Sequence, residues 1–194
     1  MSADQQFRLD GRCALVTGAT RGIGRAIVLA FARAGAEITL SATDADRLQQ
    51  VARQVEATGV RAHVVAADLA DPKAPADVVE RAHTVMGGLD VLVNGAALLL
   101  MGGPAEITPH DFDRMARLNL RAPVLAMRHA GAAMRAAGGG VIINLSSAAA
   151  EAANGVYGSL KAALESYTLG LAREWGPHGI RVVAIAPGVV DTDM

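Results

Sequence analysis

Short apolar runs alternate with helix-like segments along the whole chain, and this alternation limits the fold more than any other feature of the sequence. The first run is Cys13 to Val16 and the last is Val182 to Ile185. The runs are continuous rather than alternating in polarity, which is typical of strands buried on both faces of a sheet. Parallel strands need long crossovers between them, and the helix-like segments supply these crossovers. The pattern therefore predicts an α/β fold with a parallel sheet.

The positions of the elements can be predicted from the same pattern. Six strands are expected, at residues 13–16, 38–40, 62–66, 91–93, 141–143 and 182–185. Helices are expected over 24–34, 45–58, a stretch after Pro75, 110–117, 120–135 and 157–175. Six strands joined by helices predict a Rossmann-type doubly wound parallel sheet in three α/β/α layers. The sequence has no internal repeat and no linker, so a single domain is expected over residues 1–194.

Composition and charge exclude several classes of function. Hydrophobic residues make up 52% of the chain and charged residues 19%, which excludes a disordered protein. The net charge is −1, the basic residues are dispersed and only 3% of residues are aromatic, so no nucleic-acid partner is expected. The single Cys13 is expected to be a small buried hydrophobe. No apolar run approaches a membrane span and no signal peptide is present, so we predict a cytoplasmic protein without a membrane partner.

The first strand leads into a glycine-rich turn that runs from Thr17 to Gly24. Glycines permit a tight turn and the close approach of a pyrophosphate, and the following helix directs its first N–H groups at the anion. The glycine spacing differs from the common G-x-G-x-x-G pattern, and the absence of a following Gly-Lys-Ser/Thr excludes a P-loop. The turn predicts a dinucleotide site, and a turn that merely packs helix on strand is the alternative.

Tyr157 and Lys161 stand at positions i and i+4, so they share one face of a helix. A free tyrosine has a pKa near ~10, which is about three units too high for easy proton exchange at neutral pH. A nearby cation favours the phenolate and lowers this pKa, and roughly 4 kcal/mol of interaction would bring it to neutrality. The pair therefore predicts a general acid and base, although most Tyr-x-x-x-Lys pairs are solvated helix faces.

Several ordered motifs together resemble the short-chain dehydrogenase/reductase family, from Gly11 to Met194. The motifs are the glycine turn, Asp68 after the third strand, Asn94 after the fourth, Asn119, the segment Asn144-Leu145-Ser146-Ser147, the pair Tyr157 and Lys161, and Pro187-Gly188 after the last strand. The resemblance implies a dinucleotide-dependent oxidoreductase. Among members of the family, the chain looks most like the NADP(H)-dependent beta-ketoacyl reductases.

The resemblance also implies a role for each matching residue. The cofactor phosphates would contact the glycine turn at Gly18, Thr20, Arg21, Gly22, Ile23 and Gly24. The adenosine would contact Asp68, Leu69, Asn94 and Ala96, and the nicotinamide would contact Pro187, Gly188, Val190 and Thr192. Tyr157 would be the proton donor, Lys161 would bind the nicotinamide ribose, Ser147 would steady the substrate carbonyl, and Asn119 would hold a water that links Lys161 to solvent. The reaction would be hydride transfer between the nicotinamide and a ketone or secondary alcohol.

Charge at the end of the second strand predicts which dinucleotide is bound. Enzymes that use NAD place an acidic side chain there, and the corresponding position in this chain is Ala42. Arg21 and Thr43 can meet a 2′-phosphate instead, while Asp44 is expected to cap the helix that contains Leu48. The sequence therefore predicts NADP(H) as the preferred cofactor, with NAD(H) as the alternative.

The chain departs from the family pattern at three places. The family's Asn-Asn-Ala-Gly reads Asn94-Gly95-Ala96-Ala97, so the glycine of this loop has moved. Ser147 lies only ten residues before Tyr157, a shorter segment than usual, which leaves the assignment open between Ser147 and Ser146. Relatives usually continue with a substrate-covering loop, a helix and an edge strand. The domain is expected to be truncated or unobserved after residue 194, with its C-terminal edge strand missing.

Two functions remain open from the sequence alone. The first is an NADP(H)-dependent oxidoreductase, which the intact Asn119, Tyr157 and Lys161 favour. The second is a catalytically weak dinucleotide-binding relative without a substrate lid. The alanine-rich helices at 120–135 and 157–175 resemble surfaces that pair in the family, so a homodimer or homotetramer is expected. The five histidines share no metal-ligand spacing, and no metal site is expected.

Overall fold

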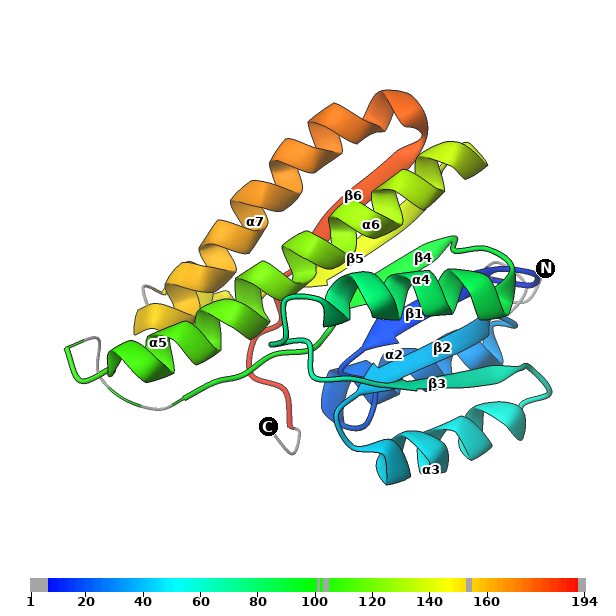
Figure 1. Cartoon of the computed structure of the whole chain (residues 1–194), viewed down its shortest axis with the longest axis horizontal. Helices are drawn as coiled ribbons and strands as arrows, with labels where there is room; N and C mark the ends of the chain where they lie inside the picture. Colours follow the sequence, from blue (N-terminus) through cyan, green and yellow to red (C-terminus); the bar gives the residue numbers. More distant parts are fainter. Residues whose placement is uncertain (1–6, 101, 103–104, 153–154, 192–194) are drawn as a thin grey trace.

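The computed structural model describes residues 7–100, 102, 105–152 and 155–191, and these residues form a six-stranded parallel sheet (Figure 1). The strand order is β3-β2-β1-β4-β5-β6. The strands are β1 (Cys13–Thr17), β2 (Glu37–Ala42), β3 (Ala62–Ala66), β4 (Val91–Asn94), β5 (Gly140–Leu145) and β6 (Ile180–Ile185). The strand order reverses direction between β1 and β4, and in such sheets ligands bind at the carboxyl ends of the strands next to this switch point.

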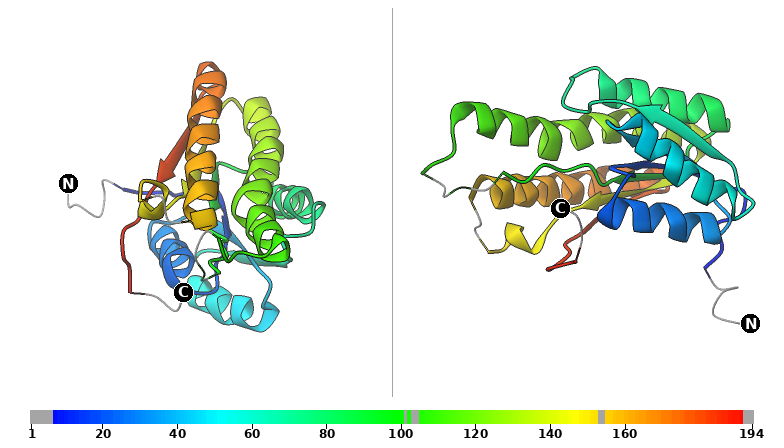
Figure 2. Two further views of the ribbon diagram at one scale, coloured as in Figure 1. Left: turned by 90° about the vertical axis from the view of Figure 1, so that its left-hand side faces the viewer. Right: turned by 90° about the horizontal axis from the view of Figure 1, so that it is seen from below.

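Helices cover both faces of the sheet, as the sequence predicts. The helices α2 (Gly22–Arg33) and α3 (Ala45–Glu56) bury one apolar cluster against β1 and β2, with Val28, Leu48 and Val55 at its centre. The helices α4 (Ala74–Met86), α6 (Ala122–Ala137) and α7 (Gly155–Trp175) cover the other face (Figure 2). The three-layer α/β/α arrangement is confirmed, and the predicted element positions agree with the structure to within a few residues.

One long helical segment replaces two predicted helices. The sequence predicts separate stretches at 110–117 and 120–135, whereas α5 (Pro109–Ala116) continues through a π-helical turn (Arg117–Arg121) directly into α6 (Figure 1). Asn119 lies in this turn and is fully buried. A π-helical turn inside an α-helix often marks a functional position.

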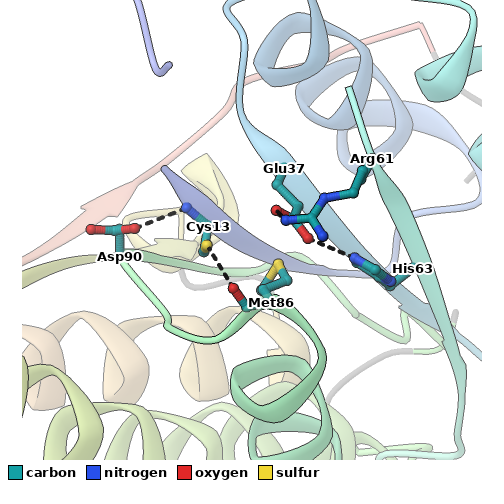
Figure 3. A network of polar contacts seen from close by, with 6 residues as sticks. All are labelled: Cys13, Glu37, Arg61, His63, Met86 and Asp90. Atoms are coloured by element: carbon teal, nitrogen blue, oxygen red, sulfur yellow. Dashed lines mark hydrogen bonds and ion pairs between the residues drawn. The ribbon is translucent and has the colours of Figure 1, made fainter. Parts of the chain in front are cut away.

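A polar network lies at the amino ends of β1, β2 and β3 (Figure 3). Glu37 accepts hydrogen bonds from Arg61 and from the Nε2 edge of His63, which lies 2.7 Å from its Oε1. The carboxylate of Asp90 accepts the backbone N–H of Cys13 at 2.8 Å, and the Cys13 thiol donates to the Met86 carbonyl. Cys13 is half-buried rather than fully buried as predicted, and burial raises the pKa of its thiol. We call this group the amino-end network.

Candidate functional site

A cleft of about 480 Å³ lies at the carboxyl ends of the strands, next to the switch point between β1 and β4. Most of the predicted cofactor residues line it: Gly18, Thr20, Arg21, Gly22, Ile23, Gly24, Ala42, Thr43, Asp68, Leu69, Ala96, Tyr157, Lys161 and Pro187. These residues come from both halves of the chain. The fold therefore brings the glycine turn and the Tyr157–Lys161 pair to one cavity.

The glycine turn has the geometry that a close backbone contact requires. Gly18 and Gly22 have φ angles of +69° and +51°, in the left-handed region that favours glycine. A Cβ atom on Gly18 would lie 2.8 Å from the backbone of Gly95 and Ala96, and a Cβ on Gly24 would overlap the Gly18 carbonyl. Arg21 is the N-cap residue of α2, and an arginine side chain cannot accept a hydrogen bond from the first N–H groups of a helix. These donors can therefore serve an anion, and the turn fits a pyrophosphate.

The moved glycine of the β4 loop is explained by its contact with β1. A Cβ atom on Gly95 would lie 2.7 Å from the Thr17 carbonyl oxygen. The buried Thr17 hydroxyl accepts the N–H groups of Gly95 and Ala96 at 3.0 and 3.3 Å and donates to the Val93 carbonyl. Thr17 thus fixes the floor of the cleft, a role that the sequence analysis missed. The sequence feature that indicates this role is the position of Thr17, a polar residue at the end of an apolar strand.

Tyr157 and Lys161 lie one helical turn apart at the start of α7, and both line the cleft. The Lys161 ammonium donates to the Leu145 carbonyl at 2.7 Å and lies 5.5 Å from the centre of the Tyr157 ring. Lys161 is only 2% exposed. Because burial disfavours its charged form, its pKa is lowered to about 8.

The pKa of Tyr157 differs in direction from the sequence-based expectation. It is raised in the protein without cofactor, because burial of the phenol outweighs a hydrogen bond with Ser147 that acts in the opposite direction. The expected lowering by Lys161 is thus not found in this state. Tyr157 therefore carries its proton at neutral pH, which is the form that can donate to a substrate oxygen.

The structure distinguishes the two candidate serines. Ser147 contacts Tyr157 and accepts the Ala149 N–H at 3.2 Å, at the start of a short 3-10 turn (Ala148–Ala150). Ser146 instead donates to the Glu165 carboxylate on α7. The backbone on either side of Ser147 is tied to β6 and its following loop, since Ser146 N donates to Ile185 O and Ala148 N donates to Pro187 O. The hydrogen bond to Tyr157 thus belongs to Ser147, whereas Ser146 lines the cleft and Ser147 is absent from its lining.

Asn94 is a predicted site residue whose side chain points into the protein rather than lining the cleft. It is buried and donates to Asn144 Oδ1 at 2.8 Å, and Asn144 donates to the Thr168 hydroxyl on α7 at the same distance. Because this chain of amides links β4, β5 and α7, it fixes the register of the helix that holds Lys161. Contact between Asn94 and a cofactor is left to its backbone, as the resemblance implies.

Asn119 is also absent from the cleft lining among the described residues. Its side-chain amide donates to the carbonyls of Leu98 and Met115 at 2.7 and 3.0 Å, and its Oδ1 accepts the Leu98 N–H at 3.1 Å. It therefore fastens the segment after β4 to the π-helical turn. The predicted water link to Lys161 stays a prediction.

The end of β2 contains no acidic side chain, as predicted, but the following helix adds a residue that the sequence analysis missed. Asp44 caps α3 by accepting the Arg47 N–H at 3.0 Å, which confirms its predicted capping role. Arg47 lines the cleft together with Ala42, Thr43 and Asp44. Its separation from Asp44 by three residues at a helix start was the signal that could have found it.

The predicted nicotinamide wall is described only in part. Pro187 lines the cleft, whereas Gly188 and Val190 are exposed beside it. Thr192 lies outside the described residues. In the described ranges no three histidine, cysteine or acidic side chains gather as metal ligands, and no helix there is long and apolar enough to cross a membrane.

Comparison with known proteins agrees with this geometry. A family model described as short chain dehydrogenase matches residues 12–194. The chain belongs to the short-chain dehydrogenase family. It is 34% identical to versicolorin reductase of Emericella nidulans, over all of this chain and 75% of that protein, and 34% identical to gluconate 5-dehydrogenase of Gluconobacter oxydans, over all of this chain and 77% of that protein.

A solved short-chain dehydrogenase from Burkholderia cenocepacia, in complex with NADP, superimposes on this fold with a TM-score of 0.92. It shares 40% identity over 96% of this chain and 78% of that chain. The predicted family and fold are therefore confirmed.

Proposed function

We propose that this short-chain dehydrogenase transfers a hydride between NADP(H) and a ketone or secondary alcohol, with Tyr157 as the acid and base. The observation that carries the proposal is that Tyr157 and Lys161 line the same cleft as the glycine turn. The neighbouring contact of Ser147 with Tyr157 supports an enzyme over the catalytically weak alternative, because a shortened segment has not separated the two hydroxyls.

The residues of the cleft can divide the reaction between them. When bound, the nicotinamide supplies or accepts the hydride at the substrate carbon. During reduction, Tyr157 Oη gives its proton to the carbonyl oxygen, and Ser147 holds that oxygen with a hydrogen bond. The resulting tyrosinate is stabilised by Lys161, and the reverse reaction returns the proton to Tyr157. In the protein alone Tyr157 is protonated at neutral pH, which is the form that the reductive direction requires.

NADP(H) is the proposed cofactor, with NAD(H) as the weaker alternative. Arg21 in the glycine turn and Thr43 after β2 line the end of the cleft where a 2′-phosphate would lie, and Ala42 brings no negative charge there. Asp68 uses its Oδ1 to accept the Ala70 N–H at 2.9 Å, so its other oxygen can accept from the adenine amino group. NADP in the Burkholderia cenocepacia structure is consistent with this proposal.

We also propose self-association as a homodimer or homotetramer through α6 and α7. A groove of about 670 Å³ lies between α7 and the stretch that runs from α5 through the π-helical turn to the start of α6. It is lined by Ala116, Leu120, Val124, Ala163 and Tyr167 together with the charged Asp113, Arg117 and Arg121. Tyr167 is 41% exposed in this groove, and Phe112 on α5 and Leu169 on α7 are exposed as well. Sedimentation at micromolar concentration should give a dimer or tetramer, and a monomer would overturn this proposal.

The proposed activity can be tested with the wild-type protein. NADPH is incubated with a panel of aliphatic, aromatic and beta-keto carbonyl compounds, and NADP⁺ with the matching secondary alcohols, while nicotinamide absorbance is followed. Turnover of at least one carbonyl compound is expected, with a lower rate for NADH at equal concentration. Binding of NADPH without turnover of any member of either panel would favour the catalytically weak alternative.

A further inference from the structure

A carboxylate lies in the proposed cofactor site just after the end of β2. Asp44 lines the cleft two residues after Ala42, and its side chain is 47% exposed. A carboxylate at this place repels a 2′-phosphate and can instead accept a hydrogen bond from a 2′-hydroxyl, as the acidic residue of NAD enzymes does. Asp44 alone would thus favour NAD(H), against the preference that Arg21 predicts.

Arg47 occupies both oxygens of this carboxylate. Its backbone N–H donates to Asp44 Oδ1 at 3.0 Å, and its Nε lies 3.2 Å from Oδ2. The first contact is the helix cap and the second is an ion pair between the side chains. Asp44 can therefore accept a ribose hydroxyl only by sharing an oxygen that Arg47 already contacts, and the guanidinium cancels its charge.

The ion pair also orients the guanidinium of Arg47 toward the cleft. Asp44 contacts the Nε edge, while a guanidinium carries four more N–H donors on its two terminal nitrogens. Such a fork matches the oxygens of a phosphate. Arg47 lines the cleft with Arg21, which belongs to the glycine turn, so cations from two separate elements lie at its adenosine end. The two arginines balance the charges of Asp44 and Asp68, the two carboxylates that line this end, and Asp44 is already paired with Arg47.

We infer that Arg47 is a second specificity-determining residue for NADP(H), and that its pairing with Asp44 converts an acidic position into a phosphate-binding one. This inference rests on the proposed use of NADP(H) and adds to it the residue on α3. In the absence of the 2′-phosphate, the same pair leaves NADH without a free carboxylate to bind its 2′-hydroxyl.

The inference is tested by titrating NADPH and NADH into the protein and following nicotinamide fluorescence, so that no turnover is needed. R47Q should raise the Kd for NADPH about tenfold, which is the size of one charge-assisted hydrogen bond, and should lower the Kd for NADH, because it frees Asp44 Oδ2 to accept the 2′-hydroxyl. R47K keeps the charge and should stay within about threefold of wild type. R53Q, on the same helix but away from the cleft lining, is the matched control and should leave both constants unchanged.

The outcomes distinguish a failure of the role of Arg47 from a failure of the proposed NADP(H) preference. A wild-type protein that binds NADH as tightly as NADPH contradicts the NADP(H) preference itself. A wild-type preference for NADPH that R47Q and R47K both retain in full overturns the role of Arg47 and leaves the preference to Arg21. Thermal unfolding of each variant without cofactor shows whether the loss of the Asp44 contact, rather than of a phosphate ligand, has changed the fold.

Discussion

The two ends of the parallel sheet both hold buried or partly buried charged groups, yet they differ in what those groups contact. At the amino end, the carboxylates of Glu37 and Asp90 are each held by an arginine and by a further donor. At the carboxyl end, the buried Lys161 donates to a backbone carbonyl, and its pKa is lowered. The difference teaches that the carboxylates at the amino end are held by partners within the protein, whereas Lys161 has a backbone carbonyl as its partner and faces a cleft, where its charge is available for chemistry.

The largest expected effect comes from the Tyr157 hydroxyl. The Y157F variant should lose roughly 10²- to 10⁴-fold in kcat for ketone reduction, because it removes the general acid, while its Kd for NADPH stays near that of wild type. The matched control is Y167F on the same helix, whose hydroxyl lies away from the cleft lining. Steady-state kinetics combined with NADPH titration checks this prediction. Full activity of Y157F would show that Tyr157 is not the general acid.

The next effect is the pH dependence that burial of Lys161 imposes on stability. Below pH 8 the lysine is charged in the folded and unfolded states, and the folded state bears the whole cost of burying the charge. Between pH 8 and 10.5 the folded protein releases a proton that the unfolded chain retains, so stability rises with pH.

K161M should remove this dependence. At pH 7 the free energy of unfolding of K161M should exceed that of wild type, because the variant buries no charge. This difference should shrink by about 3 kcal/mol from pH 7 to 10.5, as measured by urea denaturation at each pH. An advantage that stays constant over this range would mean that Lys161 is not held at a lowered pKa.

The smallest effect is expected at the amino-end network. Glu37 is 14% exposed in its side chain, and E37Q weakens two charge-assisted contacts while keeping the shape of the residue. We expect a loss of about 1 kcal/mol in the free energy of unfolding and no change in the Kd for NADPH. D77N breaks the more exposed pair with Arg81 on α4 and should cost less than about 0.5 kcal/mol. A weaker NADPH affinity in E37Q would show that the two ends are coupled.

The sequence predicts the frame of the fold well because burial on both faces leaves continuous apolar runs such as Ala14 to Val16. It predicts the cleft well for residues that face it from strand ends, such as Gly18 and Asp68. The π-helical turn around Asn119 was not predicted, and the contacts that Asn119 makes there with Leu98 lie outside the local helical period.

Side-chain direction and burial account for the remaining differences. Asn94 meets Asn144 across fifty residues of sequence, and no local pattern indicates that contact. The pKa of Tyr157 was expected to be lowered, because the spacing to Lys161 is visible in the sequence, whereas the burial that raises it is not. The place of Arg47 in the cleft lining depends on its ion pair with Asp44, whereas the sequence indicates only that Asp44 caps the helix.

The most direct test of the contrast between the two ends is hydrogen–deuterium exchange of the wild-type protein with and without saturating NADPH. Slower exchange is expected in the peptides that contain Gly18 to Gly24, Thr43 to Arg47 and Asp68 to Ala70, all of which meet at the cleft. Peptides that contain Cys13, Arg61 and His63 should exchange at unchanged rates. Protection at these amino-end positions with none at the glycine turn would contradict the location of the cofactor site.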